Sequence, residues 1–142
     1  MLDAVALLRA LHGHIGVLAA AALLHPVLSL PADGPVRRST RWSALASSTL
    51  AVATFGAGWA LYPGYRRGTK RQLLDHAPEL ARAFETKEHL AFYVLVLAVC
   101  GVGLVYRTPD RHGLRAARWC YGLAGVLAIG VAILGSVVGS WR

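Results

Sequence analysis

Four long segments without a charged side chain determine what this chain can fold into. They cover residues 11–30, 42–62, 90–106 and 119–141 and contain no Asp, Glu, Lys or Arg. A helix needs roughly 20 apolar residues to cross the hydrocarbon core of a bilayer, and a spanning helix satisfies its own backbone hydrogen bonds. We therefore predict an all-α fold, an integral membrane four-helix bundle. It forms a single transmembrane domain over residues 1–142, with spans at about 5–30, 42–62, 88–106 and 115–140.

The basic residues lie mainly in the short loops between these segments. The chain has a net charge of +8, and lipid phosphates together with the positive-inside bias account for loop arginines and lysines in a membrane protein. We predict contact with the lipid bilayer, no nucleic-acid binding, and a multi-pass location in a bacterial inner membrane. Other membrane-protein subunits are expected partners, because pairs such as Gly135 and Gly139 allow close helix packing. Cys100 and Cys120 are expected to be small buried core residues.

The loop before the third apolar segment carries its own helical pattern. Apolar side chains recur at spacings of three and four from Leu73 to Phe84, with charged residues between them. Pro78 suits the first turn of a helix. We expect a short element that ends near His76, and then one helix from about Pro78 through the third span to Tyr106. The amphipathic extension before that span would cover lipid headgroups or the open end of the bundle.

Histidines interrupt the first apolar segment and mark the starts of two later ones. His14 and His25 are eleven residues apart, which is about 20° past three helical turns, so they share one face of the helix. His89 begins the third span at the same membrane face as His14, and His112 begins the fourth span at the same membrane face as His25. The spacing predicts two pairs between helices, His14 with His89 and His25 with His112. His12 points elsewhere and is expected to face interfacial water.

Two neutral imidazoles that face each other across a helical bundle are suitable axial ligands for haem iron. We therefore predict a haem b cofactor and a role in membrane electron transfer, either alone or as a subunit of a respiratory complex. His25 has an alternative role, a hydrogen bond to a carbonyl freed by Pro26. If all the histidines are structural, the chain is a cofactor-free accessory subunit that packs against a larger membrane complex.

A transition-metal site is a third possibility at the same membrane boundary. Glu85 and His89 are four residues apart and therefore on one helix face, with Glu88 adjacent. Together with His12 or His14, these side chains could bind copper, iron or zinc, as in a metal-binding assembly factor. Ion pairs such as Glu88 with Lys87 are the simpler explanation of these acids. The sequence contains no serine-hydrolase, P-loop or zinc-protease motif, so we expect no intrinsic catalysis beyond electron transfer.

Three stretches carry a resemblance to known proteins: RALHGHIG with LLHP, KEHLAFY, and RHGLRAARWCYG. They resemble the small four-helix membrane proteins related to b-type cytochromes and respiratory-oxidase accessory factors, which present histidines near the ends of their spans. The resemblance covers most of the chain as architecture. It implies the handling of haem or a redox metal beside a respiratory complex.

Overall fold

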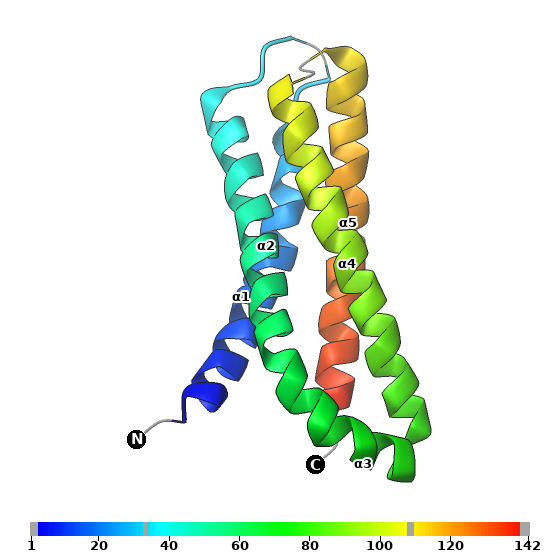
Figure 1. Ribbon diagram of the computed structural model, residues 1–142. Helices are drawn as coiled ribbons and strands as arrows, with labels where there is room; N and C mark the ends of the chain where they lie inside the picture. The colour runs from blue at the N-terminus through cyan, green and yellow to red at the C-terminus, as the bar shows by residue number, and fades with distance from the viewer. Residues whose placement is uncertain (1–2, 33, 108–109, 140–142) are drawn as a thin grey trace.

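The computed structural model describes residues 3–32, 34–107 and 110–139, and these residues form helices without a strand (Figure 1). The helices are α1 (Ala4–Ser29), α2 (Arg38–Arg67), α3 (Thr69–His76), α4 (Pro78–Arg107) and α5 (Arg111–Gly139). All but α3 are long and apolar enough to cross a membrane. The predicted all-α bundle with four spans is therefore confirmed, and the chain has the character of a multi-pass membrane protein.

The helix ends follow the local sequence closely. Asp3 caps α1 by accepting a hydrogen bond from the Val5 amide at 3.1 Å, and Asp110 accepts from the Gly113 amide at 2.6 Å at the start of α5. Side-chain acceptors at these positions satisfy amides that have no partner inside the helix. α2 continues through Pro63 to Arg67, five residues beyond the predicted span, because polar turns outside the bilayer can continue a helix.

The amphipathic segment before the third span has the predicted form. α3 ends at His76, and α4 begins at Pro78 and continues without a break to Arg107. The apolar stripe packs on the bundle end rather than only on lipid headgroups, since Ala81 is buried and the Phe84 ring stacks on Tyr65 of α2 with 3.6 Å between centroids.

The four long helices form a square in which each packs on two neighbours. α1 packs on α2 and α5, and α4 also packs on α2 and α5, so that α1 and α4 are diagonal to each other. α3 lies between α2 and α4 at the end of the bundle that also holds both termini (Figure 1). At that end the first turns of α1 diverge from the other helices (Figure 1).

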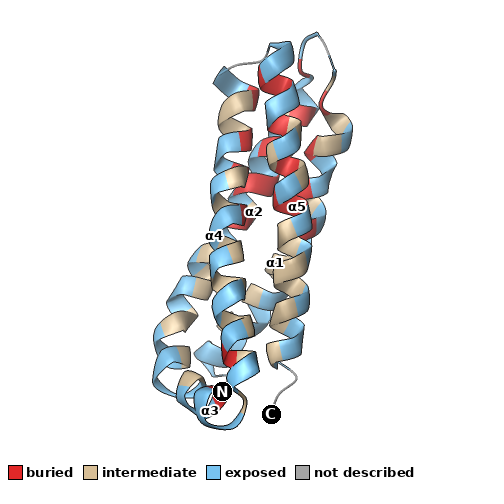
Figure 2. Cartoon of the chain, turned by 90° about the vertical axis from the view of Figure 1, so that its right-hand side faces the viewer, coloured by how far each residue is buried: buried red, intermediate tan, exposed pale blue. Residues whose placement is uncertain are grey.

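The buried core occupies only one half of the bundle (Figure 2). We call this the closed half; its buried residues lie at 19–26 in α1, 40–51 in α2, 94–105 in α4 and 113–125 in α5. The open half consists of residues 4–18, 52–93 and 126–139. Among the described residues of the open half, only Leu73 and Ala81 are buried, both where α3 meets α4.

A buried tyrosine joins three helices in the closed half. Tyr121 of α5 is fully buried and donates its hydroxyl to the Ala44 carbonyl of α2 at 3.0 Å. Ser48, whose hydroxyl oxygen is 3.0 Å from that of Tyr121, donates to the Ala98 carbonyl of α4 at 2.9 Å. Buried hydroxyls of this kind are stabilising only when they are paired, so this network holds α2, α4 and α5 in a fixed register.

The two cysteines do not both lie in the core. Cys100 is exposed on the outer face of α4, and Cys120 is half-buried. The prediction of a buried position is therefore wrong for Cys100. A small apolar side chain inside a span can equally face lipid, because the surroundings of the bundle are also apolar.

Candidate functional site in the open half of the bundle

The structure separates the histidines into one inward-facing side chain and five exposed ones. All six lie within the described residues, and His12 is the one that is half-buried. His12 is eleven residues from the fully buried Leu23 and therefore on the core face of α1. His14 follows after a rotation of about 200° and faces away from the core. The exposed set is His14, His25, His76, His89 and His112.

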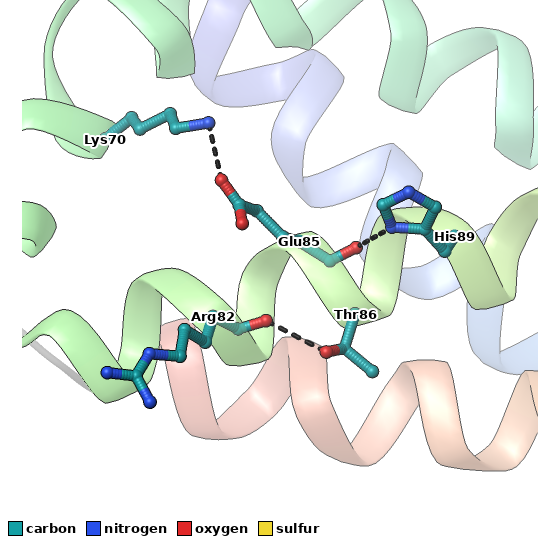
Figure 3. A network of polar contacts seen from close by, with 5 residues as sticks. All are labelled: Lys70, Arg82, Glu85, Thr86 and His89. Carbon is teal, nitrogen blue, oxygen red and sulfur yellow. Dashed lines mark hydrogen bonds and ion pairs between the residues drawn. The ribbon is translucent and has the colours of Figure 1, made fainter.

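The predicted pair His14 and His89 is not brought together across the interior. On α4, Lys87 shares the core face with the buried Ala98, eleven residues later, so His89 is turned about 200° away from that face. Each imidazole instead bonds within its own helix: Nδ1 of His14 lies 2.7 Å from the Ala10 carbonyl oxygen, and Nδ1 of His89 lies 2.7 Å from that of Glu85 (Figure 3). The periodicity correctly places residues on shared faces but does not identify the face that meets the core.

The predicted pair His25 and His112 forms no hydrogen bond between its two rings in the described part of the chain. Nδ1 of His25 lies 2.7 Å from the Ser43 hydroxyl of α2 and 3.5 Å from that of Ser29. The hydroxyl of Ser43 therefore takes the place of the carbonyl expected near Pro26. His112 is exposed at the start of α5 and forms no hydrogen bond with the described part of the chain.

The acidic residues before the third span do not form the predicted metal site. Glu85 accepts a hydrogen bond from Lys70 of α3 at 2.8 Å (Figure 3). This bond raises the pKa of Lys70. Within residues 3–32, 34–107 and 110–139, no three His, Cys, Asp or Glu side chains are grouped to hold a metal ion. The set His14, His89, Glu85 and Glu88 is therefore not gathered around one point.

His12 is held in a specific orientation between α1 and α2. Its Nδ1 lies 3.0 Å from the Thr54 carbonyl oxygen. A carbonyl only accepts, so Nδ1 carries the hydrogen, and the neutral ring keeps its lone pair on Nε2. A Cβ added to Gly58 would lie 2.9 Å from the His12 Cε1 atom. Glycine at position 58 thus provides the space for this ring, a role that the sequence did not reveal.

Lys87 faces the interior from the opposite corner of the square. It is half-buried, and its Nζ atom lies 4.5 Å from the centroid of the Phe84 ring, within the range of a cation–π contact. Its Cδ atom lies 3.8 Å from the position of a Cβ on Gly135 of α5. Lys87 forms no ion pair or hydrogen bond with the described residues.

His12 and Lys87 lie at nearly the same depth. His12 packs against Gly58 of α2. The rings of Phe55 in α2 and Phe92 in α4 are 6.5 Å apart between centroids, so these two residues lie at similar depth. Because α2 and α4 are antiparallel, Gly58, three residues after Phe55, lies level with residue 89. Lys87 is two residues away, or about 3 Å along the helix axis. The open half therefore contains an imidazole and an amine at similar depth, on the diagonal helices α1 and α4.

Tyr65 completes the polar lining at this end. Its ring stacks on Phe84, and its hydroxyl oxygen is buried without a hydrogen-bond partner in the described part of the chain. The aromatic neighbours Phe55, Trp59 and Tyr62 continue this line along α2. Aromatic side chains with one polar tip are typical of the membrane–water boundary.

In comparisons with known protein families, curated proteins and solved structures, no match to this chain is found. The open half offers one oriented imidazole at His12, one half-buried ammonium at Lys87 and one buried hydroxyl at Tyr65.

Proposed function

We propose that the chain binds haem b in the open half and carries electrons in the membrane, as a subunit of a larger electron-transfer complex. The observation that supports this proposal is the orientation of His12. Its Nδ1–H is fixed on the Thr54 carbonyl, which leaves Nε2 free on the core face of α1. A histidine that ligates a metal commonly donates its other ring N–H to a backbone carbonyl, and this bond fixes the ring and raises its basicity.

The residues around His12 include small ones. No large apolar side chain is buried between the long helices of the open half, within the described residues. Thr54 and Gly58 are small, and the rings of Phe55 and Phe92 lie about one turn deeper. A bound haem would supply reversible one-electron chemistry at its iron.

The structure supplies one inward imidazole where the sequence predicted two ligands from one chain. We therefore propose His12 as the axial ligand from this chain in place of the pair His14 and His89. A haem with one protein ligand is high-spin, whereas two imidazoles make it low-spin, so the two arrangements have different absorption spectra. A second ligand would come from a partner subunit.

Haem titration of the purified protein in detergent tests the proposal. We expect a Soret band in the wild type, its loss in His12→Ala, and its retention in His14→Ala and His89→Ala, which serve as matched controls from the same membrane level. A Soret band that survives in His12→Ala and disappears in His14→Ala would restore the original pair and refute the assignment of His12.

A second function, a cofactor-free accessory subunit, is favoured by the outward-facing imidazoles. His14 and His89 are exposed on α1 and α4 at the level of the open half. Ionisable side chains that face lipid are costly, and they usually face protein instead. In this case the protein isolated with its native partners is colourless, and replacing both histidines with leucine releases the chain from the complex. A coloured complex that stays intact in the double variant would exclude this function.

A further inference from the structure

A cavity lies between the end of α1 and the start of α2, at the end of the bundle opposite both termini (Figure 1). Its volume is about 560 Å³, within the range of about 300–1,000 Å³ that is typical of ligand sites. Part of its lining is apolar and includes Leu28, and its polar lining residues are His25, Ser29, Arg37, Ser39 and Thr40. The cavity is therefore separate from the open half and differs from it in chemistry.

Hydrogen bonds hold the two walls of this cavity together. Thr40 of α2 is buried and donates its hydroxyl to the Ser29 carbonyl of α1 at 3.4 Å. Nδ1 of His25 lies 2.7 Å from the Ser43 hydroxyl. A hydroxyl can donate to Nδ1, and the ring hydrogen is then on Nε2, which has no partner in the described part of the chain. The imidazole can therefore donate a hydrogen bond to a ligand in the cavity.

Arg37 gives the cavity a positive charge. This side chain forms no ion pair or hydrogen bond with the described residues. Among the described acidic residues, only Asp110 lies at this end of the bundle, and it accepts a hydrogen bond from the Gly113 amide and does not line the cavity. A guanidinium group has the planar set of donors that matches the oxygens of a phosphate. The described lining thus favours an anion.

The depth of the cavity indicates a lipid as the source of that anion. The first charge-free segment ends at Leu30 and the second begins at Trp42, so the cavity lies at the boundary between the hydrocarbon core and water. Trp42 is exposed, as is typical of a tryptophan at that boundary. Leu28 lines the cavity and is 87% exposed. An acyl chain would cover this leucine, whereas a small soluble anion would leave it bare.

We propose that this cavity binds the phosphate group of a phospholipid, with Arg37 and His25 as donors and an acyl chain along Leu28. The described lining contains no acid to pair with the amine of a zwitterionic headgroup. A lipid whose phosphate is its only charge, such as phosphatidylglycerol, is therefore preferred over phosphatidylcholine. Inorganic phosphate shares the anion but lacks the apolar body. The proposal does not depend on haem binding in the open half.

Native mass spectrometry of the delipidated protein in detergent tests the proposal. Phosphatidylglycerol and phosphatidylcholine are titrated into wild type, Arg37→Gln, Ser39→Leu and Arg38→Gln. Loss of a charged hydrogen bond predicts that Arg37→Gln weakens binding of phosphatidylglycerol by about 10-fold or more. Ser39→Leu keeps every charge but fills part of the cavity, so it should also weaken binding. Arg38→Gln is the matched control, because Arg38 is exposed and does not line the cavity, and its effect should be much smaller.

The same titrations can overturn the proposal. Equal losses in Arg37→Gln and Arg38→Gln would mean that the lipid responds to the overall charge of the loop and not to the cavity. Equal affinities of wild type for the two lipids would overturn the charge preference. Phosphorus-31 NMR with inorganic phosphate tests the other source: phosphate binding that depends on Arg37, without a preference for phosphatidylglycerol, would overturn the lipid assignment. If Arg37→Gln does not fold, Ser39→Leu decides, and an unchanged affinity for phosphatidylglycerol in that variant refutes the site.

Discussion

The position of Gly58 provides a sharp test of whether His12 holds a cofactor. In Gly58→Ala the new Cβ would lie 2.9 Å from the His12 Cε1 atom and 3.6 Å from both ring nitrogens. Carbon atoms in favourable contact are about 3.5–4.0 Å apart, so the ring has to move away from α2 by roughly 0.6–1.1 Å. The same movement lengthens the 3.0 Å bond from Nδ1 to the Thr54 carbonyl beyond hydrogen-bond range.

Loss of that bond has a calculable effect on ligand affinity. A hydrogen bond of this kind contributes about 0.5–1.5 kcal/mol net, which corresponds to roughly a threefold to tenfold weakening of haem binding. Gly56→Ala is the matched control, because a Cβ at position 56 meets no atom within 4 Å and both substitutions raise helix propensity equally.

Haem titration monitored at the Soret band measures the difference, and nitrogen-15 NMR of the His12 ring reports the tautomer in the absence of haem. We expect weaker binding and a mixed tautomer in Gly58→Ala, with wild-type behaviour in Gly56→Ala. If the two variants bind haem equally while the tautomer changes as expected, the geometry of the ring is correct and its role as a ligand is refuted.

Two further predictions concern the stability of the fold. Gly101→Ala should lower the unfolding temperature, because a Cβ at position 101 would lie 2.9 Å from the fully buried Tyr121 ring. Gly103→Ala should leave it unchanged, because a Cβ at position 103 meets no atom within 4 Å. Equal midpoints of the two variants in thermal unfolding would contradict this prediction. The pKa of Lys70 is raised by its hydrogen bond to Glu85. This bond therefore stabilises the α3–α4 contact fully at pH values below the ordinary lysine pKa of about 10.4. The stabilisation is lost as the pH rises through the pKa of Lys70 in the folded state. Hydrogen exchange in α3 should therefore rise at strongly alkaline pH in the wild type but show no such step in Lys70→Met.

The fold could be predicted from the sequence because the bilayer imposes a strong constraint. Segments of 17 to 23 residues without a charge have one simple arrangement in lipid, and the side chains of Asp3 and Asp110 cap the helices that follow them. The break between α3 and α4 was also predictable, because Pro78 suits the first turn of a new helix.

The candidate site could be predicted only in part, because the first helix is apolar on every side. An eleven-residue spacing relates His14 to His25 and equally relates His12 to Leu23, so periodicity alone does not show which pair faces the core. Packing decides it: Gly58 admits the His12 ring, and this contact joins residues 46 positions apart. The Lys70–Glu85 bond was missed for a similar reason, since it depends on how α3 folds back against α4.

The division of the bundle into two halves explains how a small membrane protein can contain a polar interior. In the closed half the hydroxyl network of Tyr121 and Ser48 and the hydrogen bond from Arg118 to the Leu30 carbonyl, 2.6 Å long, fix the helices to one another. That half therefore carries most of the packing free energy, because buried contacts and paired polar groups are concentrated there. His12 and Lys87 lie beyond it and contribute little to the core. These two polar side chains are consequently tolerable in the open half, where partial burial costs less free energy than full burial in a packed interior would.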